Sequence, residues 1–278
     1  MGSSSSKAGN PAKSKKVIEG KLSNASKTGV LSLKDIELKA SSSVWGKIAA
    51  TGLSAKLKTL DISGNNLKTL PPEIYDMENL RTLHCSRCNV QYTHDMSAFT
   101  RLNTIDLDNN DLESAVLAVL PQSLTKLNVS NNHLASIPTS AFVELGQLVE
   151  LNLSGNRLTS VEGVGVLTRL HILYLDDNRL QELSIDMAMC TSLKHLSVKN
   201  NLISAKSISR EGEQSIPKAI FEDTALTVLD LSGNQMISKS IVMGFEGVDD
   251  FIERRKKSLD KNLAGGAVID SSLFGTLD

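Results

Sequence analysis

The stretch LVELNLSGNRL, residues 148–158, carries the pattern that decides the fold. At its centre, Leu151 and Leu153 flank polar Asn152, and such an alternation is typical of a short strand with one buried face. The first and eleventh positions of the stretch are also leucine, and the ninth is asparagine. One such segment cannot bury its apolar face alone, so we expect it to pack against neighbours of the same kind.

These neighbours are present, because the same spacing, with Asn or Cys at the ninth position, occurs eight times in tandem. The eight copies start at Leu57, Leu80, Leu102, Leu124, Leu148, Leu170, Leu193 and Leu226. Successive starts are 22 to 24 residues apart, except for a last interval of 33 residues. A weaker copy starts at Thr28 and has Ile36 at the ninth position. This period predicts a solenoid in which each copy is one turn of chain.

The ninth position predicts how the turns are held together. A carboxamide both donates and accepts, so it can satisfy buried backbone groups of adjacent turns. The predicted ladder consists of Asn65, Asn110, Asn132, Asn156, Asn178, Asn201 and Asn234. The segments between the strands are too short for a full helix with loops. We therefore expect short helical or 3-10 turns on the outer, convex side and a parallel sheet on the inner, concave side.

This pattern resembles the intracellular proteins of the leucine-rich-repeat family over about residues 20–260, since eight tandem matches are highly specific. The resemblance implies an α/β solenoid shaped as a horseshoe, with a capping helix at the C-terminal end. It also implies adaptor-type protein binding without a defined chemistry. The chain departs from the pattern in its last repeat interval, where residues 204–225 form either a neutral loop or part of a binding surface.

The two ends of the solenoid need caps, because terminal repeats otherwise expose their core. We expect a basic, disordered arm over 1–27, the solenoid over 28–240, a capping helix over 241–263 and a disordered tail over 264–278. Trp45 is expected to shield the first repeats. The run of four basic residues at 254–257 is interpreted as a solvated helix face.

Composition and charge narrow the classes of function. Only 4% of residues are aromatic, so aliphatic side chains must fill the core. Residues 1–27 carry six lysines and one glutamate, a net charge of +5, which leaves −6 for the rest of a chain whose net charge is −1. A mildly acidic body argues against nucleic-acid binding. Three cysteines and no apolar leader indicate a reducing, cytoplasmic location without a disulfide framework.

The N-terminal sequence MGSSSSK fits the signature for N-myristoylation, with Gly2 as the acceptor. One acyl chain binds membranes only marginally, so a second signal is needed. The basic residues Lys7, Lys13, Lys15 and Lys16 can supply it through an anionic membrane surface on the cytoplasmic side. The alternative is an unmodified arm.

The pair Cys85 and Cys88, with His84 and His94 nearby, invites a zinc interpretation. The repeat register argues against it, because both cysteines occupy buried positions whereas His84 points outward. A structural zinc site also needs four well-placed ligands. We therefore predict structural cysteines, whose pKa burial should raise.

The concave face holds the candidate partner-binding residues, which occupy the third, fifth, seventh and eighth positions of the middle repeats. They are Asp106, Asp108, Asn128, Glu150, Asn152, Ile172, Tyr174, Asp176, Asp177, His195 and Lys199. An aromatic residue with an apolar neighbour and a charged surround is typical of an interaction hot spot. The alternative is a generic polar sheet face that contacts only water.

These patterns predict a scaffold or adaptor in intracellular signalling that binds a protein partner. The alternative is a regulatory subunit of a signalling enzyme, such as a protein phosphatase. The sequence shows no catalytic grouping, and we expect no cofactor, no metal and no small-molecule substrate.

Overall fold

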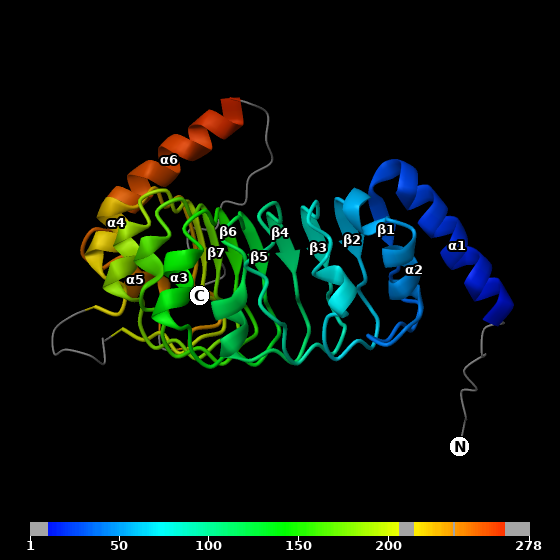
Figure 1. Cartoon of the computed structure of the whole chain (residues 1–278). Helices are drawn as coiled ribbons and strands as arrows, with labels where there is room; N and C mark the ends of the chain where they lie inside the picture. The colour runs from blue at the N-terminus through cyan, green and yellow to red at the C-terminus, as the bar shows by residue number, and fades with distance from the viewer. Residues whose placement is uncertain (1–10, 206–213, 236, 265–278) are drawn as a thin grey trace, which may run out of the picture.

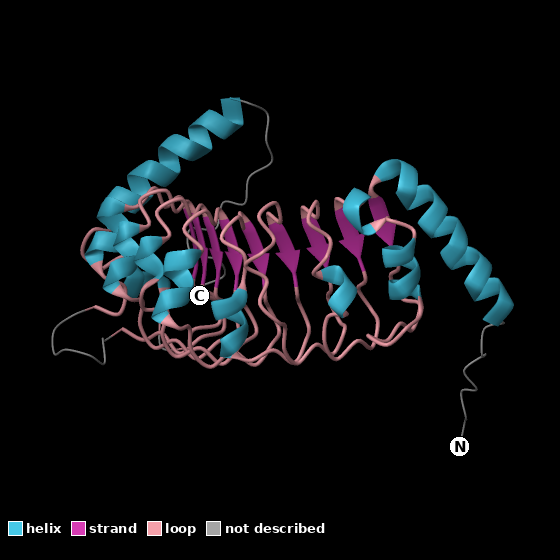
Figure 2. Ribbon diagram, in the orientation of Figure 1, coloured by secondary structure: helices cyan, strands magenta, loops and turns pink. Residues whose placement is uncertain are grey.

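The computed structural model describes residues 11–205, 214–235 and 237–264, which form a solenoid (Figure 1). Within these ranges one nine-stranded parallel sheet runs along the molecule (Figure 2), and its strands follow one another in sequence order. The strands are β1 Val30–Ser32, β2 Thr59–Asp61, β3 Thr82–His84, β4 Thr104–Asp106, β5 Lys126–Asn128, β6 Glu150–Asn152, β7 Ile172–Tyr174, β8 His195–Ser197 and β9 Val228–Asp230. The predicted fold class is therefore confirmed.

Each strand is three residues long, and its middle residue faces the core. In β6, Leu151 is buried between the half-buried Glu150 and Asn152. A leucine or isoleucine occupies the central position of every strand, and it lies opposite the central residue of each neighbouring strand. The outer two residues of each strand consequently point to the opposite, concave face.

The return segments form short helices, as expected. They are α2 Val44–Ala50, η1 Ser54–Lys56, η2 Pro72–Ile74, η3 Ser114–Val119, α3 Thr139–Glu144, η4 Val164–Val166, η5 Ile185–Met189 and α4 Lys218–Asp223. Prolines precede or open several of them, because a proline lacks the amide that the first turn leaves unpaired. Their apolar residues close the core from the convex side.

The asparagine ladder is present, and Asn156 illustrates its geometry. Its Nδ2 donates to the carbonyls of Val129 and Leu153 at 3.1 and 2.9 Å, and its Oδ1 accepts from the Leu134 amide at 3.0 Å. Each of the seven ladder asparagines is at most 7% exposed. One carboxamide thus satisfies backbone groups of two successive repeats in the core, where unpaired groups are costly.

Cys88 replaces asparagine in one repeat, and the backbone compensates. The Leu67 amide, which an asparagine would have bound, donates instead to the carbonyl of Cys88 at 2.9 Å. The Cys88 Sγ contacts the Ile62 carbonyl oxygen at 3.1 Å. The ladder therefore has one weaker rung, which lies between Asn65 and Asn110.

The residue before each rung has a left-handed backbone, with φ between +51° and +76° in all nine repeats. Glycine, asparagine and aspartate tolerate this conformation best, and they fill the position in every repeat except that of Arg87. Gly155 has a second reason to be glycine, because a Cβ there would lie 2.3 Å from the Asn131 Oδ1.

The N-terminal end corrects one expectation. Residues 11–27 are not disordered, because helix α1, Pro11–Thr28, occupies them (blue in Figure 1). Ala25 is fully buried, and Ile18 and Leu22 pack against the core of the first repeat. These three residues share one helical face, so burying them orders the helix. Trp45 of α2 is also buried, and its Nε1 donates to the Lys39 carbonyl at 3.0 Å.

The C-terminal cap differs from the expected single helix over 241–263 in where it starts and in its contact with α4. Two helices replace the expected single one, α5 Lys239–Val242 and α6 Val248–Ala264. Phe251 of α6 is buried against Phe221 of α4, with ring centroids 6.2 Å apart. The second half of the 204–225 segment is therefore part of the core, whereas residues 206–213 and the predicted tail beyond Ala264 lie outside the described residues.

The basic run at 254–257 is not wholly solvated. Arg255 is only 6% exposed, and its Nη1 donates to the Thr227 carbonyl at 2.8 Å. In the preceding repeat, the equivalent carbonyl of Lys194 accepts the amides of Thr227 and Val228. The Arg255 guanidinium thus donates to the Thr227 carbonyl in the way that backbone amides of a further repeat would do.

We expect Asn156→Ala to lower the free energy of unfolding by about 3 kcal/mol, because it leaves the buried Leu134 amide unpaired and removes one of the two carboxamide donors from each of the Val129 and Leu153 carbonyls. Cys88→Ala should cost about 1 kcal/mol, because a thiol is a weak donor and the backbone already covers this rung. Urea unfolding followed by circular dichroism measures both. Equal losses in the two variants would contradict the ladder energetics.

Candidate functional site

The structure places all eleven predicted partner-binding residues on or beside the concave face of β4 to β8. Asp106, Asn128, Asn152 and Tyr174 each end a strand and lie in register with one another. Glu150, Ile172 and His195 form a parallel row at the first position of their strands. Asp108, Asp176, Asp177 and Lys199 follow directly after β4, β7 and β8.

The apolar surface, defined as Ile172, Tyr174, His195 and Val228, lies at the C-terminal end of this face. The rings of Tyr174 and His195 have centroids 5.2 Å apart and are tilted by 59°. Ile172, His195 and Val228 lie opposite one another on β7, β8 and β9, and all four residues are half-buried. Sequence reasoning missed Val228, although it occupies the same repeat position as Ile172.

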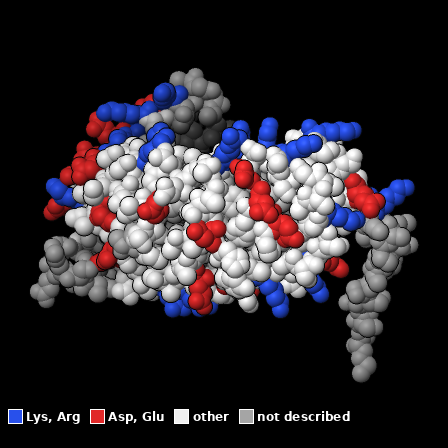
Figure 3. Space-filling model, in the orientation of Figure 1, with Lys and Arg blue, Asp and Glu red and all other residues white. Residues whose placement is uncertain are grey.

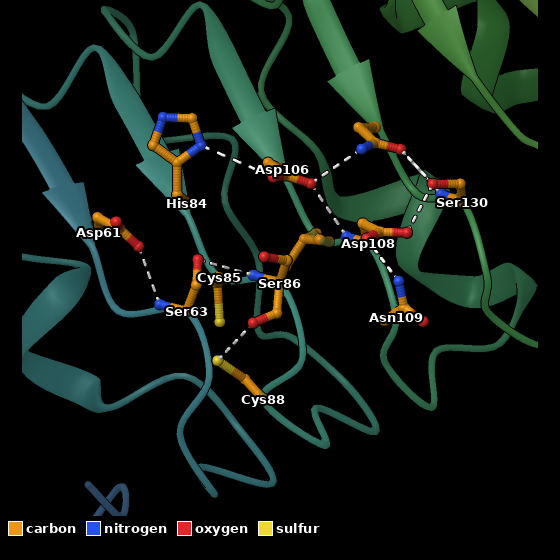
Figure 4. Close-up of polar contacts among 12 residues, drawn as sticks. Asp61, Ser63, His84, Cys85, Ser86, Cys88, Asp106, Asp108, Asn109 and Ser130 are labelled. Atoms are coloured by element: carbon orange, nitrogen blue, oxygen red, sulfur yellow. Dashed lines mark hydrogen bonds and ion pairs between the residues drawn. The ribbon is translucent and has the colours of Figure 1, made fainter. Parts of the chain in front are cut away.

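The acidic floor, defined as Asp61, Asp106, Asp108, Asp176 and Asp177, extends along the same surface. Neutral donors hold the carboxylates in place (Figure 4). The Asp106 Oδ1 accepts from the Asn128 Nδ2 at 3.0 Å, and the Asp108 Oδ1 accepts from the Ser130 Oγ at 2.8 Å. These donors fix the geometry of the carboxylates without removing their charge.

The carboxylates beside the apolar surface are held in the same way. The Asp176 Oδ1 accepts from the Ser197 Oγ at 2.5 Å and from the Lys199 amide at 2.8 Å. The Asp177 Oδ1 accepts from the Asn200 Nδ2 at 2.8 Å. Each bond joins one repeat to the next, so the acidic side chains are fixed by the solenoid itself.

Two further carboxylates on this face are neutralised by lysine. Lys126 lies 2.8 Å from the Glu150 Oε2, and Lys199 lies 3.2 Å from the Asp230 Oδ2. The hydrogen bond to Asp230 raises the pKa of Lys199, which keeps this lysine charged and paired. His84 lies 3.8 Å from Asp106, and the charges of Asp176 and Asp177 contribute to raising the pKa of Lys199, whose ion pair is with Asp230.

Basic residues lie at the margin of this face instead. Lys58, Arg81 and Lys194 are exposed and directly precede β2, β3 and β8. Figure 3 shows one side of the molecule on which acidic side chains lie near the middle and basic side chains lie along the upper and lower edges. The charge of the solenoid is therefore unevenly distributed across its surface.

The cysteine pair is buried and free, as predicted. Burial is expected to raise the pKa of both thiols. The pKa of Cys85 is raised, but a hydrogen bond with Cys85 lowers the pKa of Cys88. His94 packs against the rings of Tyr75 and Tyr92, each with a centroid distance of 5.8 Å. Among the described residues no group of three or more His, Cys, Asp or Glu side chains is arranged to hold a metal.

The candidate lipidation site Gly2, together with Lys7, lies outside the described residues. Lys13, Lys15 and Lys16 lie on the first turns of α1, where Lys16 is exposed. No helix in the described ranges has the length and apolar character needed to cross a bilayer.

His195 supplies a test of the site's electrostatics. Burial lowers its pKa from the ordinary 6.5, against the opposing effect of Asp176 and Asp230. The neutral form is therefore favoured by folding, so its contribution to stability is complete above pH 6.5 and is lost as the pH falls through the folded-state pKa. We expect an NMR titration to give a pKa below 6.5, and His195→Gln to weaken the loss of stability on acidification. A titration midpoint above 6.5 would contradict this description.

The comparisons with known proteins agree with this architecture. Families described as leucine-rich repeats match residues 55–91, 122–165 and 223–245. Bovine Toll-like receptor 6 is 30% identical over 169 residues, which cover 58% of this chain and 21% of the receptor. Mouse oligodendrocyte-myelin glycoprotein is 31% identical over 174 residues, which cover 62% of this chain and 36% of the glycoprotein. The chain thus spans less than two fifths of either relative.

Solved structures show the same fold. A leucine-rich-repeat protein of Leptospira interrogans superposes with a TM-score of 0.60 at 25% identity, covering 81% of this chain and 58% of that one. A TDR receptor superposes with a TM-score of 0.57 at 23% identity, covering 73% of this chain and 34% of the receptor. Together with the nine-stranded parallel sheet, these matches show that the chain has the fold of a leucine-rich-repeat solenoid.

Proposed function

We propose that the chain is an intracellular, non-catalytic scaffold in signalling that binds a protein partner through its concave face. The observation that carries the proposal is the apolar surface, which places an aromatic ring and two aliphatic side chains on adjacent strands of a largely polar sheet face. Two proteins that the chain resembles are named as receptors, which supports a role in recognition.

The rigidity of the sheet supports this role. Tyr174 is flanked by β6 and β8 and contacts the ring of His195, so little conformational entropy is lost when a partner covers it. Hydrogen bonds between repeats likewise fix Asp106 and Asp176 before binding. A surface that is already ordered in the free protein gains affinity in this way.

We further propose that the scaffold is tethered to the cytoplasmic face of a membrane by myristoylated Gly2, with the N-terminal lysines as the second signal. Helix α1 supports the proposal, because Lys13, Lys15 and Lys16 all belong to its first two turns. The hydrophobic contacts of α1 are made farther along, by Ile18, Leu22 and Ala25. The basic end of the helix can therefore meet a lipid surface without disturbing the cap.

Tyr174→Ala tests partner binding. Truncation of a central aromatic residue should weaken affinity by about 2 kcal/mol, or about 30-fold, and leave the fold intact. Proximity labelling in cells identifies the partner, and calorimetry with that purified protein measures the affinity. Tyr92→Ala is the matched control, because Tyr92 is 55% exposed and lies outside the nine strands. Equal labelling and equal affinity for wild type and Tyr174→Ala would reject the concave site.

Gly2→Ala tests the tether. Intact-mass analysis of protein from a eukaryotic host should show an acyl chain on the wild type only, and fractionation should move the variant from membranes to the soluble pool. Replacing Lys13, Lys15 and Lys16 with Gln should keep the acyl chain but weaken membrane binding. An unacylated wild-type Gly2 would end this part of the proposal.

A further inference from the structure

We propose that the partner presents to the concave face a basic segment that carries an aromatic or large aliphatic anchor. This inference rests on the proposed function and adds the chemistry of the partner. The anchor packs on the apolar surface, and Lys or Arg side chains of the segment contact the acidic floor.

The charge of the face supports a basic segment. The five carboxylates of the acidic floor are hydrogen-bonded by amides and hydroxyls, whereas Glu150 and Asp230 are paired with lysines. Neutral donors position a carboxylate but leave its full negative charge for an incoming cation. A charged donor forms the stronger hydrogen bond with such a carboxylate, and opposite charges also accelerate encounter.

The positive groups on the same face do not oppose this segment. Lys199 forms its ion pair with Asp230 at 3.2 Å and is attracted more weakly by Asp176 and Asp177, and Lys126 pairs with Glu150 at 2.8 Å. His195, which lies within the apolar surface, is disfavoured as a cation because it is partly buried. The exposed basic residues Lys58, Arg81 and Lys194 lie at the margin, where they repel a broad basic surface more than a narrow segment.

The spacing of the two parts limits the length of the segment. Asp176 and Asp177 follow Tyr174 on the same turn, so one basic residue belongs beside the anchor. Asp106 and Asp108 belong to the turn of β4, three strands away from β7. Adjacent strands are about 4.8 Å apart, so a second basic residue belongs about 14 Å from the anchor. About four residues of extended chain span that distance.

A library of random short peptides, displayed on phage and selected against the purified full-length chain, tests the inference. We expect the selected peptides to combine Lys or Arg with an aromatic or large aliphatic residue. A synthetic peptide of the most enriched sequence is then titrated against variants. Tyr174→Ala and the isosteric double variant D176N/D177N should each weaken binding about tenfold or more. Raising the salt concentration should weaken binding of the wild type but affect the double variant less.

The matched control is Asp223→Asn, which removes an exposed carboxylate at the end of α4, away from the strands. It should leave binding of the peptide unchanged. Thermal unfolding of every variant separates a lost contact from a lost fold, and the Asn replacements retain the Oδ1 acceptor that the neighbouring donors use.

The outcomes separate this inference from the proposed function. Peptides that lack basic residues but depend on Tyr174 would overturn the inference and keep the concave binding site. Peptides that bind wild type, Tyr174→Ala and D176N/D177N equally would count against both. Failure to enrich any peptide would overturn the inference alone, since partner labelling tests the proposed function independently.

Discussion

The carboxamide at the ninth position of seven of the nine repeats is the interaction on which the rest of this structure depends. It lies where the chain leaves the sheet and turns into the core, and there it pairs backbone groups of two successive repeats. Without it, each turn would bury amides and carbonyls that no regular secondary structure satisfies, because the strands are only three residues long. The left-handed residue before the rung and the parallel register recur in all nine repeats, including those of Ile36 and Cys88, so the seven carboxamides stabilise a geometry that the whole stack shares.

The same constraint produces the recognition surface. Because the strands repeat the same register, residues 22 to 24 positions apart in sequence between β2 and β8, and 33 apart between β8 and β9, become neighbours about 4.8 Å apart in space. Side chains on the concave face are therefore free to vary, while the buried positions are not. In this chain the variation has placed aromatic and aliphatic residues on β7 to β9, and carboxylates held by neutral donors on both sides of β5 and β6.

Much of this arrangement could be predicted from the sequence, because periodicity alone fixes which side chains share a face. The ladder, the sheet and the placement of residues such as Asp106 and Tyr174 required only the repeat register. The N-terminal helix escaped prediction because its apolar face consists of just three small or aliphatic residues among lysines, and their burial depends on the first repeat. The contact of Arg255 could not be predicted either, since it depends on how α6 approaches the last strand. The sequence also could not predict which carboxylates pair with lysine and which are held by neutral donors, because this depends on side-chain geometry.

The contact between Arg255 and the Thr227 carbonyl has a consequence for how this architecture can change in length. A stack of identical turns has no intrinsic end, since each turn offers the same unpaired carbonyl to the next. Here a guanidinium supplied by α6 occupies the position that the amides of an additional turn would need. Duplication or deletion of internal repeats leaves this terminator intact. Addition of a repeat after the last strand would first have to displace the buried Arg255 guanidinium. The solenoid can therefore gain repeats in its interior but not after β9.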